Sequence, residues 1–129
     1  MPFPLSDEEL KKTEKEIAAE LPSSYRNAMM IDNGGFVKVR GEEWQLFPIR
    51  DQSSRKLITR TANHILKETK PAQEWAGYPE NALAIAANDY GDLLVMLRTG
   101  NGFEPQVFSW SHKDGSMELV ANDFSELKG

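Results

Sequence analysis

The stretch that decides the fold is AIAANDYGDLLVMLRTGNGFEPQVFSW, residues Ala84–Trp110. It holds three apolar runs, Ile85–Ala87, Leu93–Leu97 and Val107–Trp110, and the turns between them are rich in Asn, Asp and Gly. These residue types tolerate the backbone conformations of a tight reversal. Parallel strands need a long crossover, usually a helix, so short reversals indicate antiparallel strands. The stretch therefore predicts an α+β fold with an antiparallel sheet.

Three further segments are expected to extend this sheet, Phe36–Val39, Trp44–Phe47 and Met117–Ala121. Pro48 ends the second of them, because proline has no N–H to donate to a neighbouring strand. Lys113–Ser116 contains Asp and Gly and is a hairpin signal before the last strand. We expect a sheet of about six antiparallel strands packed with helices.

The first helix is indicated by its start. Ser6 is a favourable N-cap and Glu9 follows three residues later, which is the pattern of a capping box. Pro22 either ends this helix or opens a second one over Pro22–Ile31. Three apolar residues lie on one stripe of the first helix at helical spacing: Leu10, Ile17 and Leu21.

A third helix is expected over Ser54–Glu68, followed by a loop over Lys70–Asn81. We expect Trp75 and Tyr78 to pin this loop down, with Trp75 partly exposed. Asn122 is expected to cap a short C-terminal helix. The apolar face of the third helix would be formed by Leu57, Ile58, Ala62, Ile65 and Leu66.

Composition excludes several classes of protein. The 129 residues fit one domain, 1–129, and contain no cysteine, which excludes thiol catalysis, thiolate metal sites and disulfides. The N-terminus lacks the basic and apolar regions of a secretory signal, and no apolar run approaches the roughly 20 residues of a membrane span. We expect a cytoplasmic protein that does not enter a membrane.

Charge is unevenly spread along the chain, whose net charge is -5. Residues 36–70 carry 8 basic and 4 acidic side chains, whereas residues 71–129 carry 3 basic and 9 acidic ones. An ordinary solvated surface and an acidic face for a basic partner both fit this distribution. Direct nucleic-acid binding is disfavoured, because it needs a clustered basic footprint.

No set of residues forms a recognisable catalytic or metal site. His64 and Glu68 have helical metal-ligand spacing but no visible third ligand. Asp89 and Asp92 flank a glycine, yet apolar residues follow at once where a calcium loop needs more oxygen ligands. The contiguous segment His112–Asp114 cannot converge on one substrate from an extended chain. We therefore expect no enzyme activity, no cofactor and no metal.

Five short motifs follow one another along the chain. The first comprises Leu21-Pro22, Tyr25 and Asn33-Gly34-Gly35, and the others are Trp44–Ile49, Ile85–Asp92, Val107–His112 and Val120–Leu127. In this order they resemble the SMI1/KNR4 family, also called the SUKH superfamily, over about Ser6 to Leu127. The resemblance implies one α+β domain whose antiparallel sheet packs against helices.

The resemblance also implies a non-catalytic binding protein. Bacterial members are mostly immunity proteins that neutralise a cognate toxin, often a nuclease, by binding it, whereas the fungal namesake is a regulatory binding protein in cell-wall synthesis and signalling. Both roles fit the residues. We expect a monomer or weak homodimer that binds a basic protein partner through an acidic surface. The residues predicted for that surface are Glu80, Asp89, Tyr90, Asp92, Trp110 and Asp114.

Overall fold

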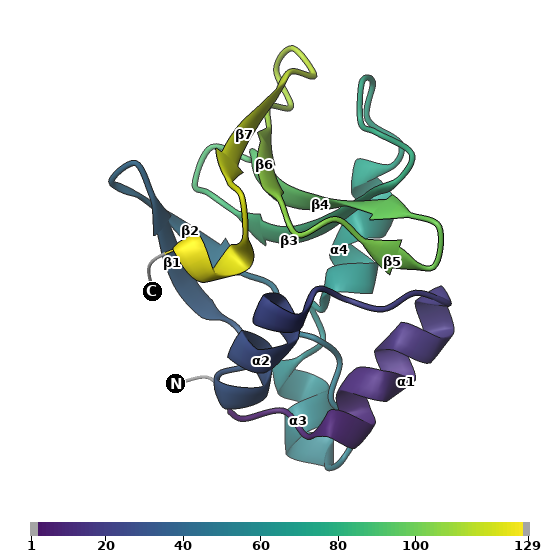
Figure 1. Cartoon of the computed structure of the whole chain (residues 1–129). Helices are drawn as coiled ribbons and strands as arrows, with labels where there is room; N and C mark the ends of the chain where they lie inside the picture. Colours follow the sequence, from purple (N-terminus) through teal and green to yellow (C-terminus); the bar gives the residue numbers. More distant parts are fainter. Residues whose placement is uncertain (1–2, 128–129) are drawn as a thin grey trace.

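The computed structural model describes residues 3–127 and combines an antiparallel sheet with four α-helices (Figure 1). The helices are α1 (Asp7–Ile17), α2 (Ser23–Ile31), α3 (Arg55–Arg60) and α4 (Ile65–Ala72), and a 3-10 turn, η1 (Phe124–Glu126), follows the last strand. The strands are β1 (Gly35–Val39), β2 (Glu42–Leu46), β3 (Ala82–Ala87), β4 (Leu93–Thr99), β5 (Gly102–Phe103), β6 (Val107–Trp110) and β7 (Met117–Ala121).

The strand order in the sheet is β1-β2-β3-β4-β6-β7, and every neighbouring pair is antiparallel. The short β5 lies off this path and pairs with β4, and its Gly102 also forms an isolated parallel bridge with Glu20. The predicted α+β class, the antiparallel pairing and all six expected strands are confirmed, with β5 as an addition. No helix within residues 3–127 is long and apolar enough to cross a membrane.

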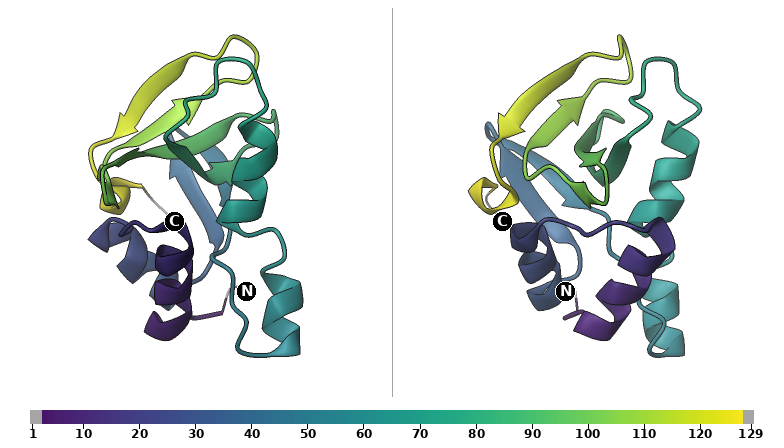
Figure 2. Two further views of the ribbon diagram at one scale, coloured as in Figure 1. Left: turned by 90° about the vertical axis from the view of Figure 1, so that its right-hand side faces the viewer. Right: turned by 45° about the vertical axis from the view of Figure 1, so that its right-hand side comes forward.

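The sheet is curled rather than flat (Figure 2). Arg40, at the tip of the β1–β2 hairpin, forms an ion pair with Glu118 on β7, although these strands are the two ends of the sheet order. Helices α1, α2 and α3 gather beyond one end of the sheet, and α4 packs against β3 (Figures 1 and 2). The central strands β3 and β4 are buried over most of their length.

The start of α1 follows the predicted capping pattern only in part. The Ser6 hydroxyl accepts a hydrogen bond from the Glu9 N–H at 3.3 Å. The Glu9 carboxylate does not return to Ser6 but accepts from the Gln52 N–H at 2.8 Å and from the Lys12 ammonium at 2.7 Å. Burial by itself raises the pKa of Glu9, yet these donors hold that pKa below its usual value. Glu9 therefore ties α1 to the segment after β2.

The first helix is shorter than predicted. It ends at Ile17, and Ala18 takes a left-handed backbone with φ 54°. The Arg98 guanidinium, on β4, donates to the carbonyl oxygens of Ile17 at 2.7 Å and Ala18 at 3.0 Å. A side chain of a distant strand thus satisfies these carbonyls at the helix end. Leu21, which was expected on the apolar stripe of this helix, is buried outside it. The second helix ends as expected at Ile31.

The third helix was predicted as one piece over residues 54–68, which is wrong. It is divided into α3 and α4 at Thr61. The Thr61 hydroxyl donates to the Leu57 carbonyl at 2.8 Å and accepts from the Asp51 N–H at 2.9 Å. His64 then caps α4 by accepting from the Lys67 N–H at 3.3 Å. Ile58 is 49% exposed, so the expected single apolar face does not exist. Helix α4 also continues to Ala72, inside the predicted loop.

The C-terminal cap was also assigned to the wrong residue. Asp123, and not Asn122, caps η1 by accepting from the Ser125 N–H at 2.9 Å. The Asn122 N–H instead donates to the Glu126 carboxylate at 2.9 Å. The error is a shift of one residue, and the turn itself is present.

Thr69 fixes α4 on the sheet. The β3–β4 register shifts between Ala84 and Ala86, which is a β-bulge. The buried Thr69 hydroxyl accepts from the Ala84 N–H at 2.9 Å and donates to the Ile65 carbonyl at 2.7 Å. One hydroxyl thus satisfies a backbone donor of the bulged strand and holds the helix in place.

We predict that Thr69→Val lowers the free energy of unfolding by about 1–3 kcal/mol, because it leaves a buried N–H without a partner. Thr69→Ser is the matched control, since it keeps both hydrogen bonds and loses one methyl group, worth about 0.8 kcal/mol. Urea unfolding of the three proteins measures both values. A Thr69→Val variant as stable as the wild type would contradict this role.

Candidate functional site

Three loops meet at one end of the sheet. They are residues 73–78 between α4 and β3, residues 88–92 between β3 and β4, and residues 111–116 between β6 and β7. The second and third loops are joined by a contact between the His112 ring and Asp92, and the first and third loops by close backbone packing of Gly77 on Gly115. We call these three segments the loop end of the sheet.

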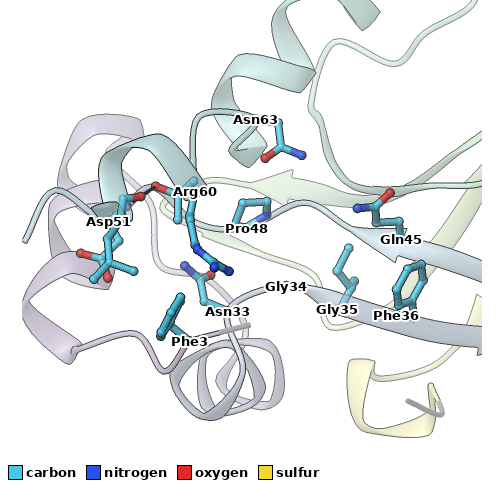
Figure 3. Close-up of a pocket in the computed structure, with 13 residues that line it drawn as sticks. Phe3, Asn33, Gly34, Gly35, Phe36, Gln45, Pro48, Asp51, Arg60 and Asn63 are labelled. Carbon is cyan, nitrogen blue, oxygen red and sulfur yellow. Dashed lines mark hydrogen bonds between the residues drawn. The ribbon is translucent and has the colours of Figure 1, made fainter. Parts of the chain in front are cut away.

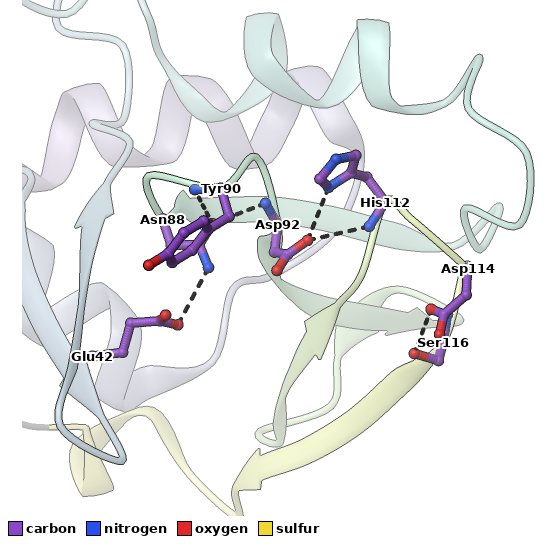
Figure 4. A network of polar contacts seen from close by, with 7 residues as sticks. All are labelled: Glu42, Asn88, Tyr90, Asp92, His112, Asp114 and Ser116. Carbon is purple, nitrogen blue, oxygen red and sulfur yellow. Dashed lines mark hydrogen bonds and ion pairs between the residues drawn. The ribbon is translucent and has the colours of Figure 1, made fainter.

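The turn at residues 88–92 is organised by one amide side chain. The side-chain oxygen of Asn88 accepts from the backbone N–H groups of Tyr90 at 3.0 Å and Asp92 at 2.9 Å. The side-chain NH2 of Asn88 donates to the Glu42 carboxylate at 3.2 Å (Figure 4). Gly91 supplies the left-handed conformation, with φ +87°. The turn is therefore held rigid, while the Tyr90 side chain is 68% exposed. Asp89 is also exposed.

Asp92 connects this turn to the next loop. One Asp92 carboxylate oxygen lies 2.9 Å from His112 Nδ1 and accepts from the His112 N–H at 3.3 Å (Figure 4). Asp92 is half-buried, so part of its charge is directed at the histidine rather than at solvent. Asp92 acts mainly in positioning His112.

Asp114 lies at the tip of the β6–β7 hairpin and is exposed. Its carboxylate accepts from the N–H of Ser116 at 3.0 Å and from the hydroxyl of Ser116 at 2.7 Å (Figure 4). These hydrogen bonds favour the ionised form and hold the pKa of Asp114 below its usual value. The tip therefore carries a negative charge at neutral and mildly acidic pH.

Trp110 differs from its prediction as a surface contact, because its side chain is 0% exposed. It stacks on Trp75, with ring centroids 5.5 Å apart and planes 23° apart, and meets the edge of Tyr78 at 5.2 Å. Its indole N–H donates to the Gly77 carbonyl at 3.2 Å. Trp110 supports the loop end from below. The expectation that Trp75 and Tyr78 pin the loop is confirmed.

Glu80 does not join the other predicted residues. It precedes β3, whereas the turn with Asp89, Tyr90 and Asp92 follows β3, so the length of the strand separates them. Glu80 instead lines a cavity with Ile17, Leu66 and Phe103 between helices and sheet. The structure thus brings together Asp89, Tyr90, Asp92 and Asp114 and leaves Glu80 apart.

The loop end also includes residues that the predicted set left out. Glu74, Trp75 and His112 line a cleft of about 630 Å³ with Asp114. Trp75 is 42% exposed although one of its faces is stacked on Trp110. A signal for Trp75 was present, because an aromatic residue in a Pro/Gly-containing loop beside Tyr78 is often exposed. The role of Glu74 depends on contacts between loops and left no sequence signal, whereas His112 closes the motif Val107–His112.

Several polar side chains of the loop end are already paired with one another. His112 and Asp92 form a pair, but the Ser116 hydroxyl is engaged by Asp114 at 2.7 Å. Within residues 3–127, no group of three or more His, Asp or Glu side chains is arranged to hold a metal ion. What the loop end does present is two exposed aromatic rings, a residue type enriched at protein interfaces, with carboxylates around them.

A second hollow lies between α3 and the β1–β2 hairpin and has a volume of about 240 Å³ (Figure 3). Its buried polar groups are already paired. Asn33 exchanges hydrogen bonds with the backbone of Ile49 at 2.7 and 2.8 Å, and Asp51 accepts from Ser53. The Arg60 guanidinium lies 4.8 Å from the centre of the Phe3 ring. Because these groups are paired within the protein, this hollow offers a partner fewer polar contacts than the loop end does.

The glycine contact at the loop end can be tested by substitution. A Cβ on Gly77 would lie 3.1 Å from the Gly115 Cα, with φ +83°, whereas Gly41 has φ +81° and nothing within 4 Å. We predict that both alanine variants lose about 1–2 kcal/mol from the left-handed backbone. Gly77→Ala should lose more and alter the near-UV circular dichroism of the stacked tryptophans. Equal losses for Gly77→Ala and Gly41→Ala would show that the loops are not in contact.

Comparison with known proteins adds one finding. The family model of SMI1 / KNR4 (SUKH-1) matches residues 4–128, nearly the whole chain. Searches of curated proteins and of solved structures gave no significant match. The curled antiparallel sheet with helices agrees with the fold that the sequence motifs implied. The chain therefore belongs to the SMI1/KNR4 family (SUKH-1).

Proposed function

We propose that this protein is a cytoplasmic immunity protein that neutralises a cognate toxin by binding it through the loop end of the sheet. Family membership supports an immunity-type binding domain at the level of the family. The placement of the binding surface at the loop end rests on two aromatic rings that have carboxylates around them. Trp75 is stacked on one face and partly exposed, and Tyr90 is exposed. The chain would act as one domain, as a monomer or weak homodimer, without cofactor or metal.

Charge indicates what kind of partner fits. Residues 71–129 carry 9 acidic and 3 basic side chains, and three of the exposed acidic ones, Glu74, Asp89 and Asp114, lie at the loop end. An acidic surface speeds encounter with a basic one and is complementary to it. A nuclease presents such a basic surface, because its substrate cleft binds phosphates. We therefore propose a basic toxin domain, with a nuclease as the leading class, whose cleft is covered sterically.

Tyr90 provides the anchoring side chain of this proposal. Interface hot spots are enriched in Tyr, Trp and Arg that insert into pockets of the partner. Tyr90 is 68% exposed on a turn whose backbone is fixed by Asn88, so little order has to be imposed when it binds. A rigid turn with an exposed ring is suited to tight, steric inhibition.

The direct test is co-expression with the product of the adjacent gene. If that gene encodes a toxin, the immunity proposal expects rescue of growth and a complex that co-purifies at a fixed ratio. A co-purifying partner that is not toxic would instead favour the alternative, a regulatory scaffold of the kind known in the fungal branch. Failure to rescue growth from a toxin that remains active in the presence of the folded protein would refute the immunity role.

The electrostatic part is tested by reversing one charge. Asp89 is exposed and its side chain is not needed for the turn, so Asp89→Lys should leave the fold intact. We expect the association rate with the basic partner to fall several-fold at low salt and its salt dependence to weaken. Asp32→Lys is the matched control, because Asp32 is exposed at the end of α2, away from the loop end. Equal rates for the two variants in stopped-flow mixing would place the interface elsewhere.

A further inference from the structure

We propose that the cleft between residues 74–77 and 112–115 is a receptor for an arginine side chain of the partner. This inference rests on the proposed function and deepens it, since it names the chemical group that the surface recognises. The cleft has a volume of about 630 Å³ and is lined by Glu74, Trp75, Ala76, Gly77, His112, Lys113, Asp114 and Gly115.

Two glycines give the cleft its floor. A Cβ on Gly77 would lie 3.1 Å from the Gly115 Cα, so the two loops touch through backbone alone. Trp110 fastens the first loop by donating its indole N–H to the Gly77 carbonyl at 3.2 Å, and the Gly115 N–H donates to the Ser111 carbonyl at 2.8 Å. The walls are therefore fixed before a partner arrives, which reduces the entropic cost of binding.

The Trp75 ring is the wall that recognises a cation. One of its faces is stacked on the buried Trp110, at 5.5 Å and 23°, so the ring is held in one orientation. Its exposed fraction of 42% leaves surface for a ligand. The face of a tryptophan is the aromatic surface most favourable for a cation within about 6 Å. A guanidinium laid against this ring would be attracted to it.

The carboxylates of the cleft supply the complementary charge. Glu74 is exposed next to Trp75, and Asp114 lies on the opposite loop. Hydrogen bonds from Ser116 orient Asp114, and the hydrogen bond from His112 to Asp92 fixes the second aromatic ring 6.1 Å from Trp75. Lys113 opposes this charge only in part, because two carboxylates line the same cleft.

The geometry favours arginine over lysine. A guanidinium is planar, so it can stack on the Trp75 ring while its edge donates to a carboxylate such as that of Glu74 or Asp114. An ammonium is a strongly hydrated point charge that cannot make both contacts in the same way. The cleft combines a flat ring with carboxylates on both loops, which is the arrangement that uses both properties of arginine.

The test uses peptides of defined charge with the intact protein. Heptaarginine and heptalysine are titrated into the wild type and each variant, and binding is followed by isothermal titration calorimetry. Both peptides should bind weakly by charge, and heptaarginine should bind about two- to five-fold more tightly, the range expected of an exposed cation–π contact.

Two variants localise the effect. Trp75→Leu should reduce the preference for heptaarginine. Glu74→Gln should reduce it too, and this variant leaves the stack of Trp75 on Trp110 intact. Glu80→Gln is the matched control, since it removes the same charge outside the cleft and should keep the preference. Thermal unfolding checks that each variant is folded. Equal binding of the two peptides to the wild type, or an unchanged preference in folded Glu74→Gln and Trp75→Leu, would overturn the inference.

The outcome is separable from that of the proposed function. If the peptides bind equally but a toxin still co-purifies and is inhibited, the arginine receptor is wrong and the immunity role stands. If heptaarginine is preferred but no toxin is bound, the cleft recognises arginine and the immunity role is wrong.

Discussion

The packing of Trp110 is the interaction on which the loop end depends. Trp110 is the last residue of β6 and is paired with Leu93 on β4 and Met117 on β7, so its backbone belongs to the sheet. Its side chain leaves the sheet to stack on Trp75 and to hydrogen-bond the Gly77 carbonyl. Burial of one large aromatic side chain stabilises a fold by about 1.5–3 kcal/mol. The Trp110 side chain thereby fixes residues 73–78, a loop without strand or helix, against the sheet.

This support explains how a small protein keeps exposed aromatic rings on its loops without losing rigidity. The turn at residues 88–92 is fixed by Asn88, the hairpin tip by Asp114 and Ser116, and the contact between them by Asp92 and His112. Each contact is a hydrogen bond within or between loops. The exposed rings are consequently presented in set positions, and a partner gains their contact area at a low cost in conformational entropy.

Much of the sheet could be predicted from sequence, because its information is local. Apolar runs separated by turns such as Asn88–Asp92 indicate strands and their antiparallel order before any contact is known. The division of the third helix was missed because it depends on Thr61 reaching Asp51 and on His64 capping α4, and neither contact alters the apolar periodicity. Trp110 was wrongly placed on the partner surface for a similar reason, since the loop that covers it has no hydrophobic periodicity.

The positions of the predicted site residues follow from the topology of the sheet. Asp89, Tyr90, Asp92 and Asp114 lie together because they belong to turns at one end of adjacent hairpins, which topology alone implies. Glu80 lies apart from them because β3, predicted as Ile85–Ala87, begins at Ala82. The three additional residues place a whole strand between Glu80 and the turn. The contributions of Glu74 and His112 arise only from the meeting of loops.

We propose that the protein acts by covering a basic protein partner with the loop end of its sheet. Hydrogen–deuterium exchange of the complex obtained by co-expression, compared with the free protein, tests this claim most directly. We expect slower exchange of backbone amides in residues 73–78, 88–92 and 111–116, with little change in α1, α2 and α3. Protection confined to those helices or to the hollow beside Phe3, with the loop end unchanged, would contradict the account.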